Sequence, residues 1–303
     1  MNDTQRNAFL SELRRRCPEL TIREKEPMSR HCSFRIGGEC DAMLFPSTVE
    51  EIRAAAELLA SAGEKPLVIG NGTNLLVTDA PLHRIVLRMG ESFSAARTEG
   101  ETVSACAGIT LAQLAVSAAR AGLGGLEFAH GIPGTLGGAV GMNAGAYGGE
   151  MKDVAEETRF LDGDLNERVF RGPEQGFGYR RSAFTEDMVL LNARLRLRPG
   201  DPDALREECR RLLEKRRSSQ PLDLPSAGSA FKRPEGAYAA ALIDRAGLKG
   251  FRIGGAMVSE KHAGFIVNAG GATASDVRRL LDAVRERVLR DTGFALEPEI
   301  KVL

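Results

Sequence analysis

The spacing of apolar residues along the chain predicts several amphipathic helices. The clearest lies at 275–291, where one apolar stripe is formed by Val277, Leu280, Leu281, Val284 and Val288. Positions three and four apart share one face of a helix, so this stripe is expected to pack against a core. Further helices are predicted at 110–121, at 237–246 and, with many charges, from about residue 201 into a Pro/Ser loop.

A helix start is predicted at residues 47–50. Ser47 and Glu50 have the spacing of a capping box, in which each side chain accepts a hydrogen bond from an amide at the helix end. Val49, Ile52, Ala56 and Leu59 follow at helical spacing, and Gly63 is typical of a helix end.

Short β-rich runs predict the strands. "PLVIGNGTNLLV" is interpreted as strand, glycine turn and strand, and "RIVLRM", "TVSACA", "MVLLNARLRLRPG", "GFIVNAG" and "EPEIKVL" as further strands. Asp162-Gly163 predicts the turn of a hairpin. The strands and helices come in segregated runs, which favours an α+β fold. Because the composition becomes strongly charged and helical beyond it, a boundary is predicted near residue 201.

The charge balance limits the classes of partner. Lys plus Arg equals Asp plus Glu at 41 each, so the chain has no basic field that would attract nucleic acid or a membrane surface. No apolar run reaches about 18 residues, and the N-terminus has no signal-peptide pattern. The five cysteines and four histidines lie scattered, without metal-ligand spacing. We therefore expect a cytoplasmic protein with reduced thiols and no metal.

The segment "GNGTNLL" (70–76) has two interpretations. It lacks the third glycine and the following helix of a dinucleotide fingerprint, and it is no ATP-type loop. Glycines allow backbone amides to approach an anion, so the turn could hold a pyrophosphate. Taken alone, a plain tight turn between strands is favoured.

The segment 131–149, "GIPGTLGGAVGMNAGAYGG", contains eight glycines and no charged side chain. We interpret it as a main-chain surface on which a flat ligand lies, since charges beneath a buried aromatic ring would be unpaired. The alternative is close packing of a glycine-rich turn on a neighbouring sheet. Two such glycine segments in one chain favour a large nucleotide cofactor.

These segments, with "YRRSAF", "PSAGSAFKRP", "GGAMVSEKHAGFIVN" and "LEPEI", occur in the order typical of one family. From about Ser33 to the C-terminus the chain resembles the UDP-N-acetylenolpyruvoylglucosamine reductases, flavoenzymes that make UDP-N-acetylmuramic acid for bacterial peptidoglycan. The length is similar to the shorter, type II form. The short glycine turn is shared with the wider vanillyl-alcohol-oxidase group of flavoproteins.

The resemblance implies an α+β fold with a two-lobed FAD-binding module of that group at 1–200, with lobes at about 1–88 and 89–200. It also implies a C-terminal α/β domain at 201–303 that binds the UDP-sugar. The FAD pyrophosphate would be held by Gly70, Asn71, Gly72, Thr73, Asn74, Leu75 and Leu76. The isoalloxazine and ribityl chain would lie against Gly131, Ile132, Pro133, Gly134, Thr135, Gly137, Gly138, Ala139, Gly141, Asn143, Ala144 and Gly145.

Three residues match the family's catalytic positions: Arg180 in "YRRS", Ser229 in "GSAF" and Glu299 in "EPEI". The resemblance implies that NADPH reduces the flavin and that hydride then passes to the enolpyruvyl methylene carbon. Arg180 and Glu299 would stabilise the enolate-like charge that develops. Glu299 would be protonated for this, with a pKa raised by burial, and Ser229 would donate the proton that completes the product.

Some positions depart from the family pattern. Arg233 stands where Asn is usual, as does Gly264, and Asn71, Thr73 and Cys40 are also atypical. Tyr179, Lys232, Arg233 and His262 are candidates for substrate binding. Two alternatives stay open: another flavin oxidase or dehydrogenase of the wider group, and a non-catalytic flavin- or nucleotide-sugar-binding regulator. No dimerisation feature is evident, so a monomer is expected.

Overall fold

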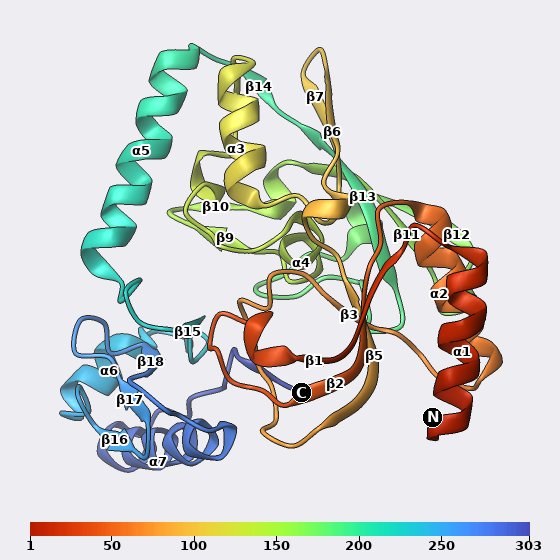
Figure 1. The fold of residues 1–303 in the computed structure, drawn as a ribbon. Helices are drawn as coiled ribbons and strands as arrows, with labels where there is room; N and C mark the ends of the chain where they lie inside the picture. The colour runs from red at the N-terminus through yellow and green to blue at the C-terminus, as the bar shows by residue number, and fades with distance from the viewer. The chain divides into compact units, whose positions relative to one another are not determined.

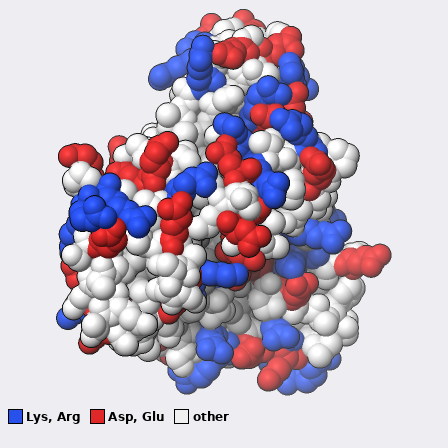
Figure 2. Space-filling model, turned by 90° about the vertical axis from the view of Figure 1, so that its right-hand side faces the viewer, with Lys and Arg blue, Asp and Glu red and all other residues white.

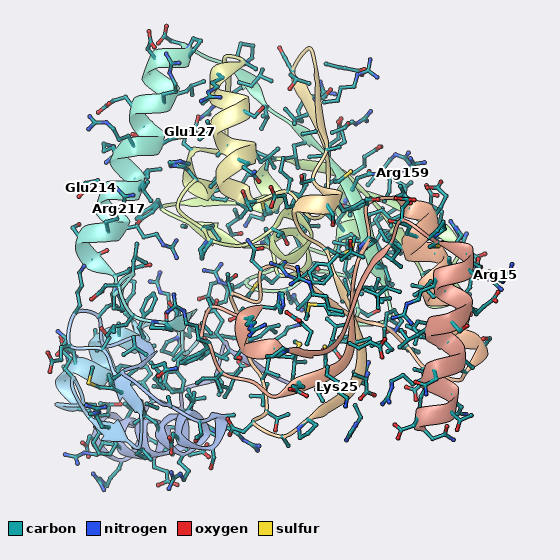
Figure 3. All side chains as sticks on the ribbon, viewed as in Figure 1. Arg15, Lys25, Glu127, Arg159, Glu214 and Arg217 are labelled. Atoms are coloured by element: carbon teal, nitrogen blue, oxygen red, sulfur yellow. The ribbon has the colours of Figure 1, made fainter.

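A computed structural model describes all residues 1–303, which form two compact units. The first unit contains 1–24, 42–71 and 83–214, and the second contains 25–41, 72–82 and 215–303. The expected boundary near residue 201 differs from this division, which falls within α5 (Pro202–Ser219). Figure 3 labels Glu214, the last residue of the first unit, and Arg217, three residues later on the same helix.

Two helices lie side by side in the first unit: α1 (Asp3–Arg16) and α2 (Val49–Ser61) (Figure 1). Their contact buries Leu10 and Leu13 against Leu59. The expected capping box at α2 is displaced by one residue, because Thr48, not Ser47, has the extended backbone of a cap and pairs with Glu51. Ser47 instead donates its backbone N–H and its hydroxyl to the Glu51 carboxylate.

A four-stranded sheet has the order β1 (Thr21–Pro27), β2 (Glu39–Phe45), β5 (Leu82–Arg88), β3 (Leu67–Ile69). β3 and β5 are parallel, with Ile69 opposite Arg88. Their carboxyl ends therefore lie at one edge, where the turn that begins at Gly70 leaves the sheet.

A five-stranded antiparallel sheet forms the rest of the first unit's framework. Its order is β12 (Glu167–Arg171), β11 (Ala155–Leu161), β13 (Val189–Arg196), β7 (Thr102–Cys106), β6 (Ala96–Glu99). The hairpin predicted around Asp162-Gly163 is confirmed as β11–β12. Helices α3 (Leu111–Arg120) and α4 (Leu136–Gly141) contribute to the core on one face, which includes Leu114, Val140 and Leu195.

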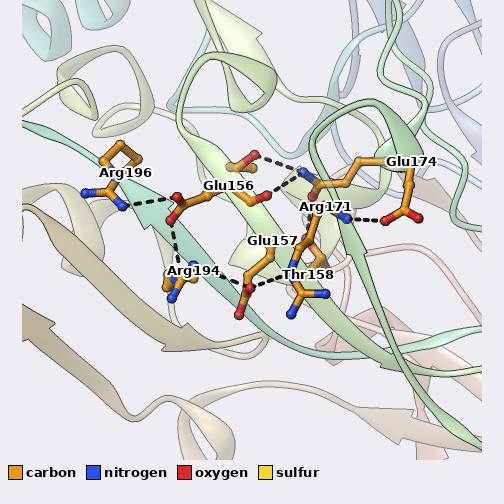
Figure 4. A network of polar contacts seen from close by, with 9 residues as sticks. Glu156, Glu157, Thr158, Arg171, Glu174, Arg194 and Arg196 are labelled. Carbon is orange, nitrogen blue, oxygen red and sulfur yellow. Dashed lines mark hydrogen bonds and ion pairs between the residues drawn. The ribbon is translucent and has the colours of Figure 1, made fainter.

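The same sheet carries a network of charged side chains (Figure 4). Glu157 lies opposite Arg171 on one neighbouring strand and Arg194 on the other, and it pairs with both. Arg194 and Arg196 also pair with Glu156, and Arg159, labelled in Figure 3, pairs with Glu167 of β12. Since the arginines are exposed, these ion pairs add little to the stability of the fold.

The second unit packs a small sheet against a long helix. The sheet order is β15 (Ser226–Ser229), β18 (Phe265–Asn268), β17 (Ala256–Val258), β16 (Arg252–Ile253). α7 (Ala274–Thr292) contacts β16, β17 and α6 (Ala239–Arg245), and every residue of its predicted stripe is buried. The helix prediction is confirmed, and Thr273 with Asp276 forms its capping box.

A strand pair joins distant parts of the second unit. β19 (Lys301–Val302) runs parallel to β4 (Leu75–Leu76), and Thr78 N–H donates to the Leu303 carbonyl at 2.9 Å. Residues 72–82 therefore group with the C-terminal segment. The remaining short elements are β8 (Leu123–Gly124), β9 (Gly145–Ala146), β10 (Gly149–Glu150), β14 (Arg198–Pro199), and the 3₁₀ turns η1 (Met28–Arg30), η2 (Glu91–Phe93), η3 (Glu127–Ala129), η4 (Met151–Asp153) and η5 (Gly172–Gln175).

The surface carries both signs of charge. Figure 2 shows Lys and Arg intermixed with Asp and Glu over the visible face, as the equal totals in the sequence lead one to expect. None of the helices has the length and apolar character that crossing a membrane requires. All five cysteines are free thiols, and burial raises the pKa of Cys40 and of Cys209 to about 11.

Candidate functional site

The first unit brings its two glycine segments together. The side-chain amide of Asn71 donates to the Pro133 carbonyl at 3.1 Å. A Cβ atom on Gly70 would collide with the Thr135 hydroxyl, so the close approach of the Thr135 side chain to the turn depends on glycine at position 70. Segments that the sequence assigns to one cofactor thus meet at the carboxyl end of β3.

The other half of the turn belongs to the second unit. Gly72 has a φ of 60°, and a Cβ there would strike the His31 carbonyl. The Asn74 side-chain amide donates to the Glu299 carbonyl at 3.0 Å. Leu75 and Leu76 form β4 and pair with β19. The turn therefore holds the Glu299 segment in place within its own unit.

The sequence left two alternatives for the segment 131–145, close packing and an open main-chain surface, and the structure contains both. A Cβ on Gly137 would lie 2.9 Å from the Cβ of Ala107, so this glycine serves close packing. A Cβ on Gly141 would have no atom within 4 Å, and one on Gly138 would have only the Thr135 hydroxyl, at 3.8 Å. Leu136, Ala139 and Val140 are buried. α4 therefore has one anchored face and one face of bare main chain, which fits a planar ring such as isoalloxazine.

Asn143 joins this glycine segment to the loop that carries Arg180. It is fully buried, and its φ of 44° lies in the left-handed region that Asn tolerates better than most residues. Its amide nitrogen donates to the Gly178 carbonyl and to the Glu150 carboxylate, each at 3.0 Å. Its carbonyl oxygen accepts from the Lys152 N–H at 2.9 Å.

Arg180 itself lies against the end of the glycine segment. Its guanidinium donates to the Gly145 carbonyl at 3.1 Å and lies 5.1 Å from the centroid of the Tyr179 ring. Its φ of 52° is unusual for a non-glycine residue. Strained backbone of this kind costs about 1–3 kcal/mol and clusters at functional sites. The first unit therefore contains both the segment 131–145, our candidate surface for the flavin ring, and Arg180, one of the three catalytic candidates.

The second unit holds the other two catalytic candidates on adjacent backbone. Ser229 ends β15, and its side chain is exposed. The next residue, Ala230, accepts a hydrogen bond from the Glu299 N–H at 2.9 Å, and the Lys232 N–H donates to the Glu297 carbonyl at 2.8 Å. This short ladder places the serine motif beside the glutamate motif, and Glu299 is half-buried there.

The substrate-binding candidates divide between the units. Tyr179 is exposed in the first unit. In the second, the Lys232 ammonium pairs with Glu297, and the Arg233 guanidinium stacks 3.9 Å from the centroid of the Tyr238 ring. His262 lies edge-on to Phe265, its Nδ1 accepts from the Gly264 N–H at 3.2 Å, and burial lowers its pKa.

Two residues near the glycine segments were missed by the sequence analysis. Glu150 contacts Asn143, and Lys152, Asn143 and Arg180 together hold the pKa of its carboxyl below its usual range against the opposing effect of burial. Arg88 lies at the end of β5, beneath the first glycine turn. Arg88 lies next to the turn because β5 pairs in parallel with β3, and no local sequence pattern encodes that pairing.

Comparisons with known proteins identify the family of both parts of the chain. Residues 40–164 match the FAD binding domain, and residues 220–303 match the C-terminal domain of UDP-N-acetylenolpyruvoylglucosamine reductase. The chain is 45% identical over 287 residues to the reductase of that name from Alkaliphilus oremlandii, covering 94% of both chains. It is 46% identical to the one from Rubrobacter xylanophilus, covering 92% of this chain and 94% of the relative.

A solved structure leads to the same family. The crystal structure of UDP-N-acetylenolpyruvylglucosamine reductase (MurB) from Thermus caldophilus superposes with a TM-score of 0.79 at 35% identity, covering 94% of this chain and 98% of that one. The predicted fold class, an FAD-binding module followed by a distinct C-terminal domain, is confirmed. With relatives above 30% identity along nearly the whole chain, this protein belongs to the UDP-N-acetylenolpyruvoylglucosamine reductase family.

Proposed function

We propose that this protein reduces UDP-N-acetylglucosamine enolpyruvate to UDP-N-acetylmuramate, with FAD as cofactor and NADPH as electron donor, in the synthesis of peptidoglycan precursors. Membership of the reductase family supports the reaction. The observation that carries the assignment of residues is the hydrogen bond from the Glu299 N–H to the Ala230 carbonyl, because it places two distant polar motifs side by side.

FAD would be held by main chain more than by side chains. Bound FAD would supply the two-electron redox chemistry that links NADPH to the enolpyruvyl double bond. The Gly70–Asn71 end of the turn and the open glycines of α4 would hold the pyrophosphate and the ring system respectively. A bare glycine face excludes water from the ring without placing a charge beneath it.

Arg180 and Glu299 would act on the substrate carboxylate. As the terminal carbon of the alkene gains hydrogen, negative charge develops on the other carbon and spreads into that carboxylate. A cation and a hydrogen-bonding acid at this position stabilise the developing charge more than they stabilise the ground state. This role requires Glu299 to carry a proton, and its side chain is half-buried beside the serine motif.

Ser229 would donate the proton that completes the saturated ether. Its hydroxyl is accessible at the end of β15, and a serine is acidic enough for this step only against a strong carbon base. Lys232, Arg233, His262 and Tyr179 would bind the sugar nucleotide. Arg233, already stacked on Tyr238, offers a planar fork suited to a phosphate.

An anaerobic reoxidation assay tests the proposal. The purified protein should be yellow, and NADPH should bleach it in the absence of oxygen. Adding the enolpyruvyl sugar should then restore the colour stoichiometrically. A protein that NADPH reduces but only oxygen reoxidises would instead be another flavin oxidase or dehydrogenase, and one that NADPH leaves unchanged would be a flavin-binding regulator.

We further propose that the protein works as a cytoplasmic monomer, without nucleic acid or membrane partners, and prefers NADPH to NADH. The balanced charge of the chain supports the absence of nucleic acid and membrane partners, since it provides no field for a polyanionic surface. Sedimentation of the holoprotein should give a mass near the chain's 32.6 kDa, and a dimeric mass would contradict the monomer.

A further inference from the structure

Arg88 is a positively charged residue that the reaction proposed above leaves without a role. It is the last residue of β5, and its side chain reaches under the first glycine turn. One guanidinium nitrogen, Nη1, donates to the Gly70 carbonyl at 2.6 Å. Both terminal nitrogens lie 3.3 Å from the Asn71 side-chain oxygen, so the guanidinium donates two hydrogen bonds to that oxygen.

The chain makes room for this guanidinium. β5 runs parallel to β3 with Arg88 opposite Ile69, so the arginine lies where the turn begins. A Cβ atom on Gly90 would come within 3.1 Å of Nη1, closer than most real Cβ contacts, so glycine at 90 leaves the guanidinium its space. Asn71 in turn donates to Pro133, so one contact chain runs from Arg88 through the turn to the second glycine segment.

The charge of Arg88 has no protein counterion. Burial is the sole cause that lowers its pKa, with no carboxylate acting on it, and its Nε has no hydrogen-bond partner. A cation removed from water without an anion is costly, so such a residue is normally paired. Its present partners are a carbonyl and an amide oxygen, which carry only partial charges.

We propose that Arg88 is an anion-binding residue for the diphosphate of FAD. The Gly70 carbonyl would repel a phosphate, and the guanidinium neutralises it while adding a full positive charge beneath the turn. Backbone amides alone supply only dipoles, whereas Arg88 brings a full charge to Gly70 and Asn71. The inference rests on the proposed binding of FAD.

Equilibrium binding of FAD to the apoprotein tests this role. Arg88→Met removes the charge and keeps much of the side-chain volume, so its Kd for FAD should rise about tenfold or more, the usual effect of a lost charge-assisted hydrogen bond. Arg84→Met is the matched control, because Arg84 lies on the same strand and donates to the Lys65 carbonyl at an exposed site. Its Kd should stay within about twofold of the wild-type value, as surface charge changes usually do.

Two further readouts separate anion binding from a structural role. Raising salt from about 0.05 M to about 0.5 M should weaken FAD binding by the wild type and by Arg88→Lys, and should weaken it less in Arg88→Met, because screening acts only on charge. Urea unfolding of Arg88→Met apoprotein should occur at an equal or higher midpoint, since an unpaired, half-buried charge is gone.

The outcomes are distinct. A wild type that binds no FAD contradicts the proposed function. A wild type that binds FAD, with Arg88→Met binding equally well or showing the same salt dependence, overturns only the role of Arg88. An Arg88→Met apoprotein that fails to fold, or that unfolds at clearly lower urea, would make Arg88 a structural residue and would also overturn the inference.

Discussion

The two regions that contain the candidate functional residues, one in each unit, are built in opposite ways. In the first unit, the segment 131–149 presents main chain, has no charged side chain, and is shaped by which glycines meet a neighbour and which do not. In the second unit, Ser229 and Glu299 present functional groups, and a backbone ladder through Ala230 holds them together. The first region therefore depends on glycines that have no side chain, and the second depends on the functional groups of its side chains.

This difference predicts opposite sensitivities to mutation. In the region made of bare backbone, an added side chain should weaken ligand binding where the ligand lies, without removing any catalytic group. A region made of side chains on a ladder should keep its fold when a hydroxyl is removed, yet lose its chemistry. Each mutation below is chosen to break this contrast or to sharpen it.

Ser229→Ala should have the largest effect. Losing a proton donor costs roughly 10²–10⁴-fold in rate, so turnover of the enolpyruvyl sugar should fall by about 10³-fold. Flavin reduction by NADPH should be nearly unchanged, because that half-reaction needs no proton from Ser229. Stopped-flow absorbance at the flavin band measures the two half-reactions separately.

The matched control is Ser226→Ala, at the other end of β15. It should leave both half-reactions close to wild type. Equal losses in the two serine variants, or an intact oxidative half-reaction in Ser229→Ala, would rule out Ser229 as the proton donor.

Arg180→Met should come next, with turnover lowered about 10²–10³-fold, the usual cost of removing one group that stabilises developing charge. The neighbouring Arg181 is exposed, so Arg181→Met controls for loss of a charge in the same loop. Steady-state kinetics at saturating sugar should show the loss in kcat for Arg180→Met alone. Comparable losses in both variants would indicate a general effect of loop charge.

Two glycine substitutions test the backbone region. Gly141→Ala places a methyl group in open space on α4, so it should raise the Kd for FAD about tenfold while the apoprotein gains up to about 1 kcal/mol of helix stability. Gly145→Ala should instead destabilise the apoprotein by about 1–3 kcal/mol through overpacking, because its Cβ would lie 2.7 Å from the Gly149 carbonyl oxygen.

Flavin fluorescence titration and urea unfolding measure these two quantities. If Gly141→Ala binds FAD as tightly as the wild type, the flavin does not lie against the open face of α4.

The smallest expected effect concerns stability at acid pH. The second unit has a charged carboxylate, Asp276, that holds the start of α7, whereas the glycine segment has no titratable side chain of this kind. Hydrogen bonds from the backbone of Thr273 and Gly255, with the ion pair to Arg279, lower the pKa of Asp276 from 3.8 to about 2. A carboxyl whose pKa is lower in the folded state stabilises the fold above its unfolded pKa. That stabilisation is lost as pH falls from about 4 towards 2.

Asp276→Asn should therefore lower the urea midpoint at pH 6 and approach the wild-type curve at the acid end. Asp282→Asn, at an exposed site on the same helix, should shift the midpoint little at either pH. A constant difference between Asp276→Asn and wild type across this range would contradict the role assigned to the charge.

The sequence predicted the features that local patterns encode. α7, α3 and the β11–β12 hairpin follow from stripes, caps and turn residues within a few positions of one another. α4 was not predicted as a helix, because glycine is a poor helix former and packing of Leu136 and Val140 supplies what propensity lacks. The one-residue error at the α2 cap arose because Ser47 and Thr48 are chemically equivalent in sequence, and only backbone geometry separates them.

The resemblance, not periodicity, supplied the catalytic trio, and even it could not supply the contacts that hold the site. The sequence predicted strands at β4 and β19, but two residues each carry no signal of their partner, and it is their pairing that brings Asn74 to Glu299. Asn143 was assigned to the cofactor, while its buried links to Glu150 and to the Arg180 loop depend on partners that no local signal names.

The pairing of β4 with β19 also has a consequence for biosynthesis. Asn74 and Glu299 are 225 positions apart, so during translation the segment 72–82 leaves the ribosome long before its partner strand exists. Contacts between such distant residues form late in folding. A nascent chain halted before residue 299 should therefore lack the order that the wild type shows around Asn74, however complete its earlier helices are.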